Sequence, residues 1–154
     1  MQKIGSTRPG ALLFSKIQPK IDRILLKLTN GKTNLTSLLS GLPIVLLTSK
    51  GAKSGLLRTT PLMGIRDPSG TGKIALIASN YGQRHHPAWY YNLKANPLVT
   101  CTMDGKQMKY VAYQAQSQEY TCYWQAAIEL YPGFAKYQLR AGERHIPIII
   151  LNPT

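Results

Sequence analysis

Short apolar runs separated by glycine, proline and aspartate follow one another along the chain from residue 42 onward. Runs of this length that are bounded by turn residues are typical of buried strands. They predict six strands, at residues 44–47, 58–63, 73–79, 98–103, 107–114 and 146–151. The dipeptide Asp104-Gly105, between the fourth and fifth strands, is typical of a type I′ hairpin turn.

Apolar residues at spacings of three and four predict helices in the segments between the strands. These helices lie at residues 87–95, 117–131 and 134–137, and Ser117 is the expected N-cap of the second. Nearer the N-terminus, residues 11–29 predict a basic amphipathic helix. Its apolar stripe suits packing against the protein's own core, and its basic face also suits an anionic bilayer.

The order of these elements does not alternate strand and helix as parallel α/β folds do. Six strands joined mostly by hairpins predict a mainly β member of the α+β class, a six-stranded antiparallel, Greek-key-like barrel with packed helices. Side chains fill the interior of so small a barrel, so we expect a ligand outside it, under loops or across a homodimer interface. The chain then divides into a basic N-terminal tail and helix, 1–41, and a barrel domain, 42–154.

The net positive charge of the chain limits the classes of binding partner that we expect. The 154 residues include 19 Lys and Arg against 6 Asp and Glu, a formal net charge of +13, while 44% hydrophobic content indicates a globular domain. An imbalance of this size suits nucleic acid, an anionic membrane surface or a polyanionic small ligand. We expect Cys101 and Cys122 to be free thiols. With no spanning segment or signal peptide evident, the expected location is the cytoplasm, with peripheral association at the inner membrane face left open.

A cationic stretch between the first two predicted strands is the strongest candidate for a binding site. Lys50, Lys53 and Arg58 lie around Gly51 and Gly55 at the predicted hairpin tip. Glycine lets backbone N–H groups turn toward an anion, and lysine and arginine add full charges. The stretch therefore predicts an anion pocket, with a solvated basic turn as the alternative. It is not a P-loop, because a strand follows it rather than a helix.

Hydrolytic and metal chemistry find little support. The acidic residues lie in predicted turns or on exposed helix faces, so no carboxylate pair is expected. His85 and His86 are adjacent, so their side chains diverge on a regular element, and no third ligand has metal spacing. We expect them to be a loop pair that adds positive charge when protonated, and we expect no metal site.

A second loop and several aromatic residues complete the candidates. Residues 78–82, Ala-Ser-Asn-Tyr-Gly, carry a hydroxyl, an amide and a flexible glycine, which suit the edge of a polar heterocycle. Trp89 either lies against a flat ring or belongs to the core. Tyr131, Phe134 and Tyr137 either form a lid whose phenols orient or protonate a substrate, or simply pack.

Three motifs carry a family resemblance. Residues 51–62, GAKSGLLRTTPL, resemble the G-x-K-S-G-x-x-R-x-x-P-L signature of the deazaflavin-dependent nitroreductase family. Residues 78–97, ASNYGQRHHPAWYYNLKANP, are similar to that family's A-S-x-G-G…P-x-W-Y-x-N-L-x-A-N-P, and residues 131–147 resemble its ending. The resemblance implies a split β-barrel related to flavin-reductase-like folds. It also implies hydride transfer from reduced coenzyme F420 to a quinone, a nitroaromatic compound or another activated acceptor.

The same resemblance assigns residues to the site. Lys53, Ser54 and Arg58 would hold the phosphate and acidic tail of the cofactor, and Ser79, Asn80 and Tyr81 would line the ring or substrate. The full set of implied cofactor-binding residues is Lys53, Ser54, Gly55, Arg58, Pro61, Leu62, Ala78, Ser79, Asn80, Tyr81, Trp89 and Asn92. The candidate catalytic residues are Tyr131, Tyr137 and Ser79.

Two positions depart from the family pattern. Phe134 stands where well-known members have a lid tyrosine, so it has no proton to give, and Asn80-Tyr81 stands where smaller or cationic residues are common. The alternatives are therefore a split-barrel reductase that binds flavin mononucleotide (FMN), or a carrier of such a cofactor without catalysis. A barrel that binds nucleic acid remains the weakest alternative, since no base-reading motif is present.

Overall fold

The computed structural model describes residues 41–154. The predicted N-terminal helix over residues 11–29 lies outside the described residues, as does nearly all of the predicted segment 1–41.

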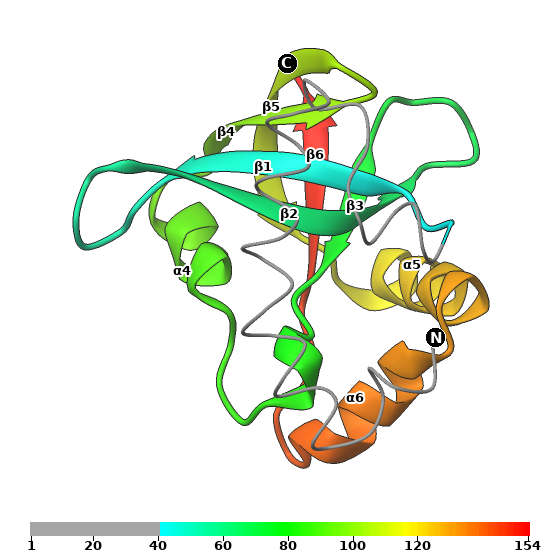
Figure 1. Cartoon of the computed structure of the whole chain (residues 1–154). Coiled ribbons are helices and arrows are strands. Elements are labelled where there is room, and N and C mark those ends of the chain that lie inside the picture. Colours follow the sequence, from blue (N-terminus) through cyan, green and yellow to red (C-terminus); the bar gives the residue numbers. More distant parts are fainter. Residues whose placement is uncertain (1–40) are drawn as a thin grey trace.

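The described part of the chain forms a closed antiparallel barrel whose strands follow the order β1-β2-β3-β6-β5-β4 (Figure 1). The strands are β1 (Ile44–Lys50), β2 (Leu57–Arg66), β3 (Ile74–Ile77), β4 (Leu98–Met103), β5 (Lys106–Gln114) and β6 (Ile148–Pro153). This confirms the predicted six-stranded barrel. At the turn between β4 and β5, Asp104 and Gly105 have φ angles of 52° and 78°, as the predicted type I′ hairpin requires.

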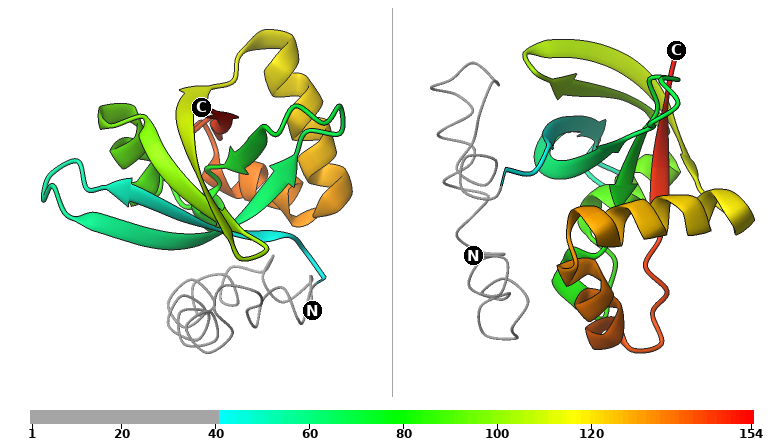
Figure 2. Two further views of the ribbon diagram at one scale, coloured as in Figure 1. Left: turned by 90° about the horizontal axis from the view of Figure 1, so that it is seen from above. Right: turned by 90° about the vertical axis from the view of Figure 1, so that its right-hand side faces the viewer.

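Helices cover the barrel on two sides (Figure 2). They are η1 (Asn80–Gly82), α4 (Ala88–Ala95), α5 (Ser117–Leu130) and α6 (Gly133–Ala141). Helix α4 packs against β1 and β5, whereas α5 packs against β2 and β6, and α6 packs against η1. None of the helices in residues 41–154 is long and apolar enough to cross a bilayer.

Two apolar clusters explain the sequence pattern of the strands. One fills the barrel and includes Leu47, Leu76 and Leu151, and the other lies between the barrel wall and helices α5 and α6. In β6, Ile149 belongs to the first cluster and Ile150 to the second. Because successive side chains of a strand point to opposite faces, a strand that is buried on both faces is apolar at every position.

The start of α5 differs from the prediction. The N-cap is Gln116, and Ser117 is the first helical residue, with a φ of 51° and no capping hydrogen bond from its neighbour's side chain. Ala115 still donates its backbone N–H to the carbonyl of Ile148 beyond the end of β5. The chain therefore turns from strand to helix at Ser117 itself, which explains why its hydroxyl does not cap the first turn.

Both cysteines are free, as expected, and they differ in environment: Cys101 is buried in the barrel and Cys122 is exposed on α5. Burial raises the pKa of the Cys101 thiol to about 12.

Candidate functional site

The tip of the β1–β2 hairpin is a tight, self-bonded turn. Pairing extends from Ile44↔Met63 to Lys50↔Leu57. Beyond that pair, the backbone N–H of Gly51 donates to the carbonyl of Leu56 at 2.8 Å, and that of Gly55 donates to Gly51 at 2.9 Å. Gly55 has a φ of +69°, which favours glycine. The hairpin extends well beyond the barrel body (Figure 1), and residues 52–59 at its tip are exposed.

The positive charges of the tip have no acidic partner in the part of the chain that the structure describes. Lys50, Lys53 and Arg58 are all exposed. Within residues 41–154 the two ion pairs join Arg66 to Asp104 and Lys73 to Glu119, so none of the three tip cations takes part in one. Concentrated cations without internal partners suit a bound phosphate or carboxylate. The tip therefore fits an anionic cofactor tail.

A contact from α4 anchors the tip from below. The side-chain carbonyl of Asn92 accepts a hydrogen bond from the backbone N–H of Ala52 at 2.9 Å. Trp89, one turn earlier on the same helix, is 6% exposed and belongs to the barrel core. This favours the core alternative for Trp89, which fixes α4 in place, while Asn92 reaches the hairpin.

Hydrogen bonds within the tip also involve Ser54. Its Oγ accepts a bond from the backbone N–H of Leu56 at 3.2 Å. The oxygen therefore shapes the turn, and the hydroxyl proton can still be donated to a ligand.

The strands β2 and β3 separate where the predicted ring-binding residues lie. They pair only from Gly64↔Leu76 to Arg66↔Ile74. Continuation of this register would place Leu62 opposite Ala78, and Pro61 opposite Ser79. Pairing with β2 ends before these positions, whereas the opposite edge of β3 stays paired: the backbone N–H of Ala78 donates to the carbonyl of Pro147 at 2.9 Å, which continues the β3–β6 register. The two predicted groups of ring-binding residues thus flank the point at which the barrel wall splits.

The edge of β2 at this split has no partner strand among residues 41–154. In an antiparallel pair, residues alternate between positions bonded to the neighbour and positions that face away. The bonds Gly51 to Leu56 and Gly64 to Pro43 fix this alternation, so Thr59 and Pro61 face away from β1, toward the split. Proline is tolerated there because its missing N–H removes no ladder bond. The flanking carbonyls and the Thr59 N–H can meet the polar edge of a heterocycle.

After β3 the chain makes a left-handed turn. Asn80, Tyr81 and Gly82 have φ angles of 47°, 56° and 76°, and the Asn80 side-chain amide donates to the carbonyl of His85 at 3.0 Å. At Gly82, a Cβ would lie 2.7 Å from the carbonyl oxygen of Tyr137. Glycine is therefore required for both its backbone conformation and its close packing.

Arginines from the C-terminal part of the chain hold this turn. Arg144 donates from Nη1 to the carbonyl of Ala78 at 3.1 Å, and from Nη2 to that of Ser79 at 2.6 Å. Its Nε donates to the carbonyl of Gln83 at 2.9 Å. Arg140, on α6, donates to the carbonyl of Tyr81 at 3.1 Å. Sequence reasoning assigned neither arginine a role, although Arg144 lies within the motif at residues 131–147.

His86 completes this arrangement, in an environment that the sequence does not indicate. Its Nδ1 lies 2.9 Å from Nη1 of Arg144, and its ring centroid lies 4.4 Å from that of Tyr90. Burial lowers the pKa of the His86 imidazole below its ordinary value, and the nearby charges of Arg144, Lys94 and His85 lower it further. The predicted gain of charge on protonation is therefore disfavoured at His86.

The aromatic residues of α6 are mostly packed rather than presented. Phe134 is 5% and Tyr137 3% exposed, both in the cluster under the helices. The hydroxyls of Tyr131 and Tyr137 are 3.1 Å apart, and the Tyr81 ring meets that of Tyr137 edge-on at 6.0 Å. Burial, and then the hydrogen bond with Tyr131, raise the pKa of Tyr137. Of Tyr131 and Tyr137, the half-buried Tyr131 is the more accessible to a substrate.

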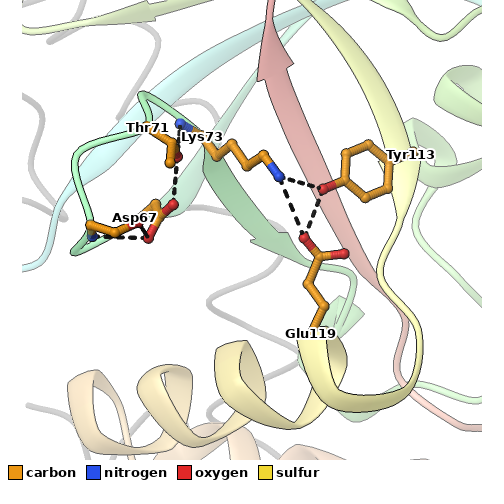
Figure 3. Close-up of polar contacts among 6 residues, drawn as sticks. Asp67, Thr71, Lys73, Tyr113 and Glu119 are labelled. Carbon is orange, nitrogen blue, oxygen red and sulfur yellow. Dashed lines mark hydrogen bonds and ion pairs between the residues drawn. The ribbon is translucent and has the colours of Figure 1, made fainter.

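A separate polar cluster lies at the other end of β2 (Figure 3). There the Tyr113 hydroxyl donates to Glu119 at 2.7 Å and Lys73 donates to the Tyr113 oxygen at 3.1 Å. Asp67 accepts bonds from Thr71 and Ser69, which lower its pKa. These groups satisfy one another, so the cluster connects the β2–β3 turn to β5 and α5. In residues 41–154 no three His, Cys, Asp or Glu residues are grouped as metal ligands.

Comparisons with known proteins point to one family. Residues 21–153 match the family described as F420H(2)-dependent quinone reductase. A Mycobacterium tuberculosis F420H(2)-dependent quinone reductase is 35% identical over 113 residues, covering 71% of this chain and 73% of that protein. A solved F420-H2 dependent reductase is 40% identical with a TM-score of 0.64, covering 71% of this chain and 94% of the other. A structure described as a domain-swapped dimer is 38% identical with a TM-score of 0.67, covering 86% and 94%.

Proposed function

The chain belongs to the F420H(2)-dependent quinone reductase family, and we propose that it transfers a hydride from reduced coenzyme F420 to a quinone. The observation that carries the proposal is the exposed cationic tip, whose charges have no acidic partner among the described residues, in a family named for a cofactor with an anionic tail. When bound, the cofactor supplies the hydride, and the protein supplies binding and orientation.

The cofactor's anionic tail is assigned to the hairpin tip. Lys53 and Arg58 bind its phosphate and carboxylates, and Lys50 adds charge at the base of the turn. Gly55 and Ser54 shape the loop, and Asn92 anchors it through Ala52. Trp89 acts through the core packing of α4 rather than by stacking, because it is buried.

The reacting ring is assigned to the split between β2 and the segment that follows β3. Pro61 and Leu62 contribute from one side. Ala78, Ser79, Asn80 and Tyr81 contribute from the other. A hydride and a proton together convert a quinone into a hydroquinone, so an orienting or proton-donating group is needed as well. We assign that role to Tyr131 and Ser79, with Tyr137 holding the Tyr131 hydroxyl.

Turnover tests this proposal. Reduced F420 is mixed with a soluble benzoquinone, and the absorbance of reoxidised F420 is followed with and without protein. We expect one F420 oxidised per quinone consumed over many turnovers, which a non-catalytic carrier cannot achieve. A nitroaromatic acceptor in parallel shows whether the activity extends to that class. Binding of FMN in preference to F420, without F420-dependent turnover, would contradict the proposal.

Association with a membrane is a separate proposal about location. We propose a cytoplasmic protein that binds reversibly to the anionic inner membrane face through the basic residues of segment 11–29, where lipid quinones are accessible. Sedimentation with anionic and neutral liposomes tests it. Unchanged liposome binding after deletion of residues 1–31 would contradict it.

A homodimer is also proposed. It is supported by the solved relative at 38% identity that is described as a domain-swapped dimer. Light scattering during size-exclusion chromatography gives the molar mass directly. A mass of one chain at all concentrations used in the assay would exclude a functional dimer.

A further inference from the structure

Arg144 occupies an unusual position between elements. It lies after the end of α6 and before β6, and its guanidinium reaches back to the segment that follows β3. Its backbone N–H donates to the carbonyl of Ala141 at 3.3 Å, which ties it to the helix end. Four contacts of 2.6 to 3.1 Å join its side chain to Ala78, Ser79, Gln83 and His86. A single side chain thus contacts both ends of the loop 79–86.

We propose that Arg144 is the positioning residue for the loop 79–86, and that it holds the loop only while the imidazole of His86 is neutral. This inference rests on the proposed function, because the loop carries Ser79, Asn80 and Tyr81, which we assign to the ring and substrate. Arg144 itself contacts the loop's carbonyls rather than the reactants.

The donor chemistry of arginine dictates the protonation state of its partner. A guanidinium has only N–H donors, so at 2.9 Å from Nη1 the Nδ1 atom of His86 must accept. The proton of a neutral His86 therefore resides on Nε2. Protonation of Nδ1 would replace this hydrogen bond by two facing N–H groups and would place a second cation beside Arg144.

The surroundings of His86 offer no charge that would stabilise an imidazolium. From α4 it faces the rings of Tyr90 and Tyr91, at 4.4 and 5.8 Å between centroids, and the ammonium of Lys94. From its own loop it faces His85, and from the segment after α6 it faces Arg144. The charged groups around it in the described structure are thus all basic. As the pH falls below the ordinary histidine pKa of 6.5, the bound loop with its neutral His86 therefore becomes less stable relative to the released loop, in which His86 can be protonated.

The loop needs an external hold because its backbone is strained. Asn80 and Tyr81 are not glycines, and both have positive φ angles, a conformation that persists only when the surroundings enforce it. Arg144 bonds the carbonyls of Ala78 and Ser79 immediately before these residues and that of Gln83 immediately after them. Loss of this hold should therefore release the loop locally, while the barrel and the hairpin tip stay intact.

Hydrogen exchange of the protein without cofactor tests whether Arg144 keeps the loop 79–86 in place. Amide exchange in residues 79–86, corrected for intrinsic rates, is compared at pH 7.5 and pH 5.5 in the wild type. Three variants are compared with it. Arg144→Lys removes the guanidinium. His86→Asn keeps an acceptor near the Nδ1 position but cannot titrate, and His86→Phe keeps a ring beside Tyr90 but has no acceptor.

We expect the wild-type loop to exchange several-fold faster at pH 5.5 than at pH 7.5, with a ceiling of about tenfold for one group of ordinary pKa 6.5. Arg144→Lys should exchange fast at both values. His86→Asn should remain protected at both, and His86→Phe should lose protection at both. Equal protection in the wild type and Arg144→Lys would overturn the inference, as would a pH dependence that persists in His86→Asn.

Measurement of kcat and of the Kd for F420 distinguishes a role of Arg144 in positioning the loop from a role in cofactor binding. In Arg144→Lys we expect kcat to fall at least about tenfold while the Kd for F420 changes less than about threefold, because the hairpin tip is intact. His86→Asn should flatten the acid limb of the pH profile of kcat. If the exchange results hold but no variant or wild-type protein turns over quinone, the proposed function fails and the hold on the loop stands. Normal kcat in Arg144→Lys with an unprotected loop would overturn the positioning role.

Discussion

The hairpin tip at residues 50–58 and the loop at residues 79–86 serve the same proposed ligand, yet they are built in opposite ways. Bonds within the tip join residues only a few positions apart, with one external contact from Asn92. The loop is held by arginines that lie 59 to 66 positions further along the chain. The tip exposes its charges to solvent, whereas the loop is packed against α6.

This difference separates two kinds of function. An exposed turn can attract and hold an anion without much dependence on the rest of the fold, because charge acts over several ångströms. Orientation of a ring and of an acceptor requires atoms fixed by packing and buried hydrogen bonds. We therefore expect variants of the tip to change affinity and variants of the loop to change stability and rate.

The largest expected effect is that of Gly82→Ala. The new Cβ would lie 2.7 Å from the Tyr137 carbonyl oxygen, on a residue with a φ of +76°. We expect a loss of about 2–4 kcal/mol in the free energy of unfolding, from backbone strain and overpacking together. Chemical denaturation measures it. Gly70→Ala is the matched control, because its φ is +77° with open space around it, and the substitution should cost only about 1–2 kcal/mol.

Acidification should weaken the loop and leave the tip unchanged. Because the folded-state pKa of His86 is lowered, its contribution to stability is complete above the ordinary pKa and is lost as pH falls through the folded value. The melting temperature should therefore fall from pH 7.5 to pH 5, and the fall should be smaller in His86→Asn. An identical pH dependence in both proteins would show that other groups cause it.

Removal of the anchor beneath the tip gives a smaller effect. Asn92→Ala deletes the acceptor of the Ala52 N–H, which should cost about 1 kcal/mol in stability. We expect F420 affinity to fall about three- to tenfold, because the tip must then be ordered on binding. Asn96→Ala, at the residue that follows α4, is the control, since its side chain makes no hydrogen bond with the described residues. Equal affinities in the two variants would contradict the anchoring role.

The smallest effect is expected at Ser54→Ala. The substitution removes the bond from the Leu56 N–H, which is exposed, so stability should change by less than about 1 kcal/mol. If Ser54 only shapes the turn, F420 affinity should fall less than about threefold. A fall of more than tenfold in a fluorescence titration would instead place its hydroxyl in direct contact with the cofactor.

The barrel was predictable because its signals are local. Apolar runs, hairpin spacing and Asp104-Gly105 indicated all six strands, and the structure confirms them. The end of β1 was missed, because Thr48, Ser49 and Lys50 carry no apolar signal. They belong to the strand through pairing with β2, and Ser49 is 2% exposed.

The site was predictable only in part, for the same reason. Three cations around two glycines are visible in the sequence, so the hairpin tip could be predicted, and its role as a binding site stays a prediction. The hold of Arg144 on Ala78 spans 66 positions, and no periodicity or turn signal connects the two. The lowered pKa of His86 could not be predicted, because burial and its basic neighbours are tertiary features. The roles assigned to Tyr131, Tyr137 and Ser79 stay predictions, with Tyr137 placed in the interior.

The most direct test of the central claim is a fluorescence titration with oxidised F420 of the wild type and the double variant Lys53→Ala/Arg58→Ala. The control is Lys106→Ala/Lys109→Ala, which removes the same charge from exposed positions on β5. We predict that the tip variant binds about 100-fold more weakly or worse, about 3 kcal/mol, while the control stays within about threefold of the wild type. Equal weakening in both variants would mean that net charge alone attracts the cofactor and that the hairpin tip is not its binding site.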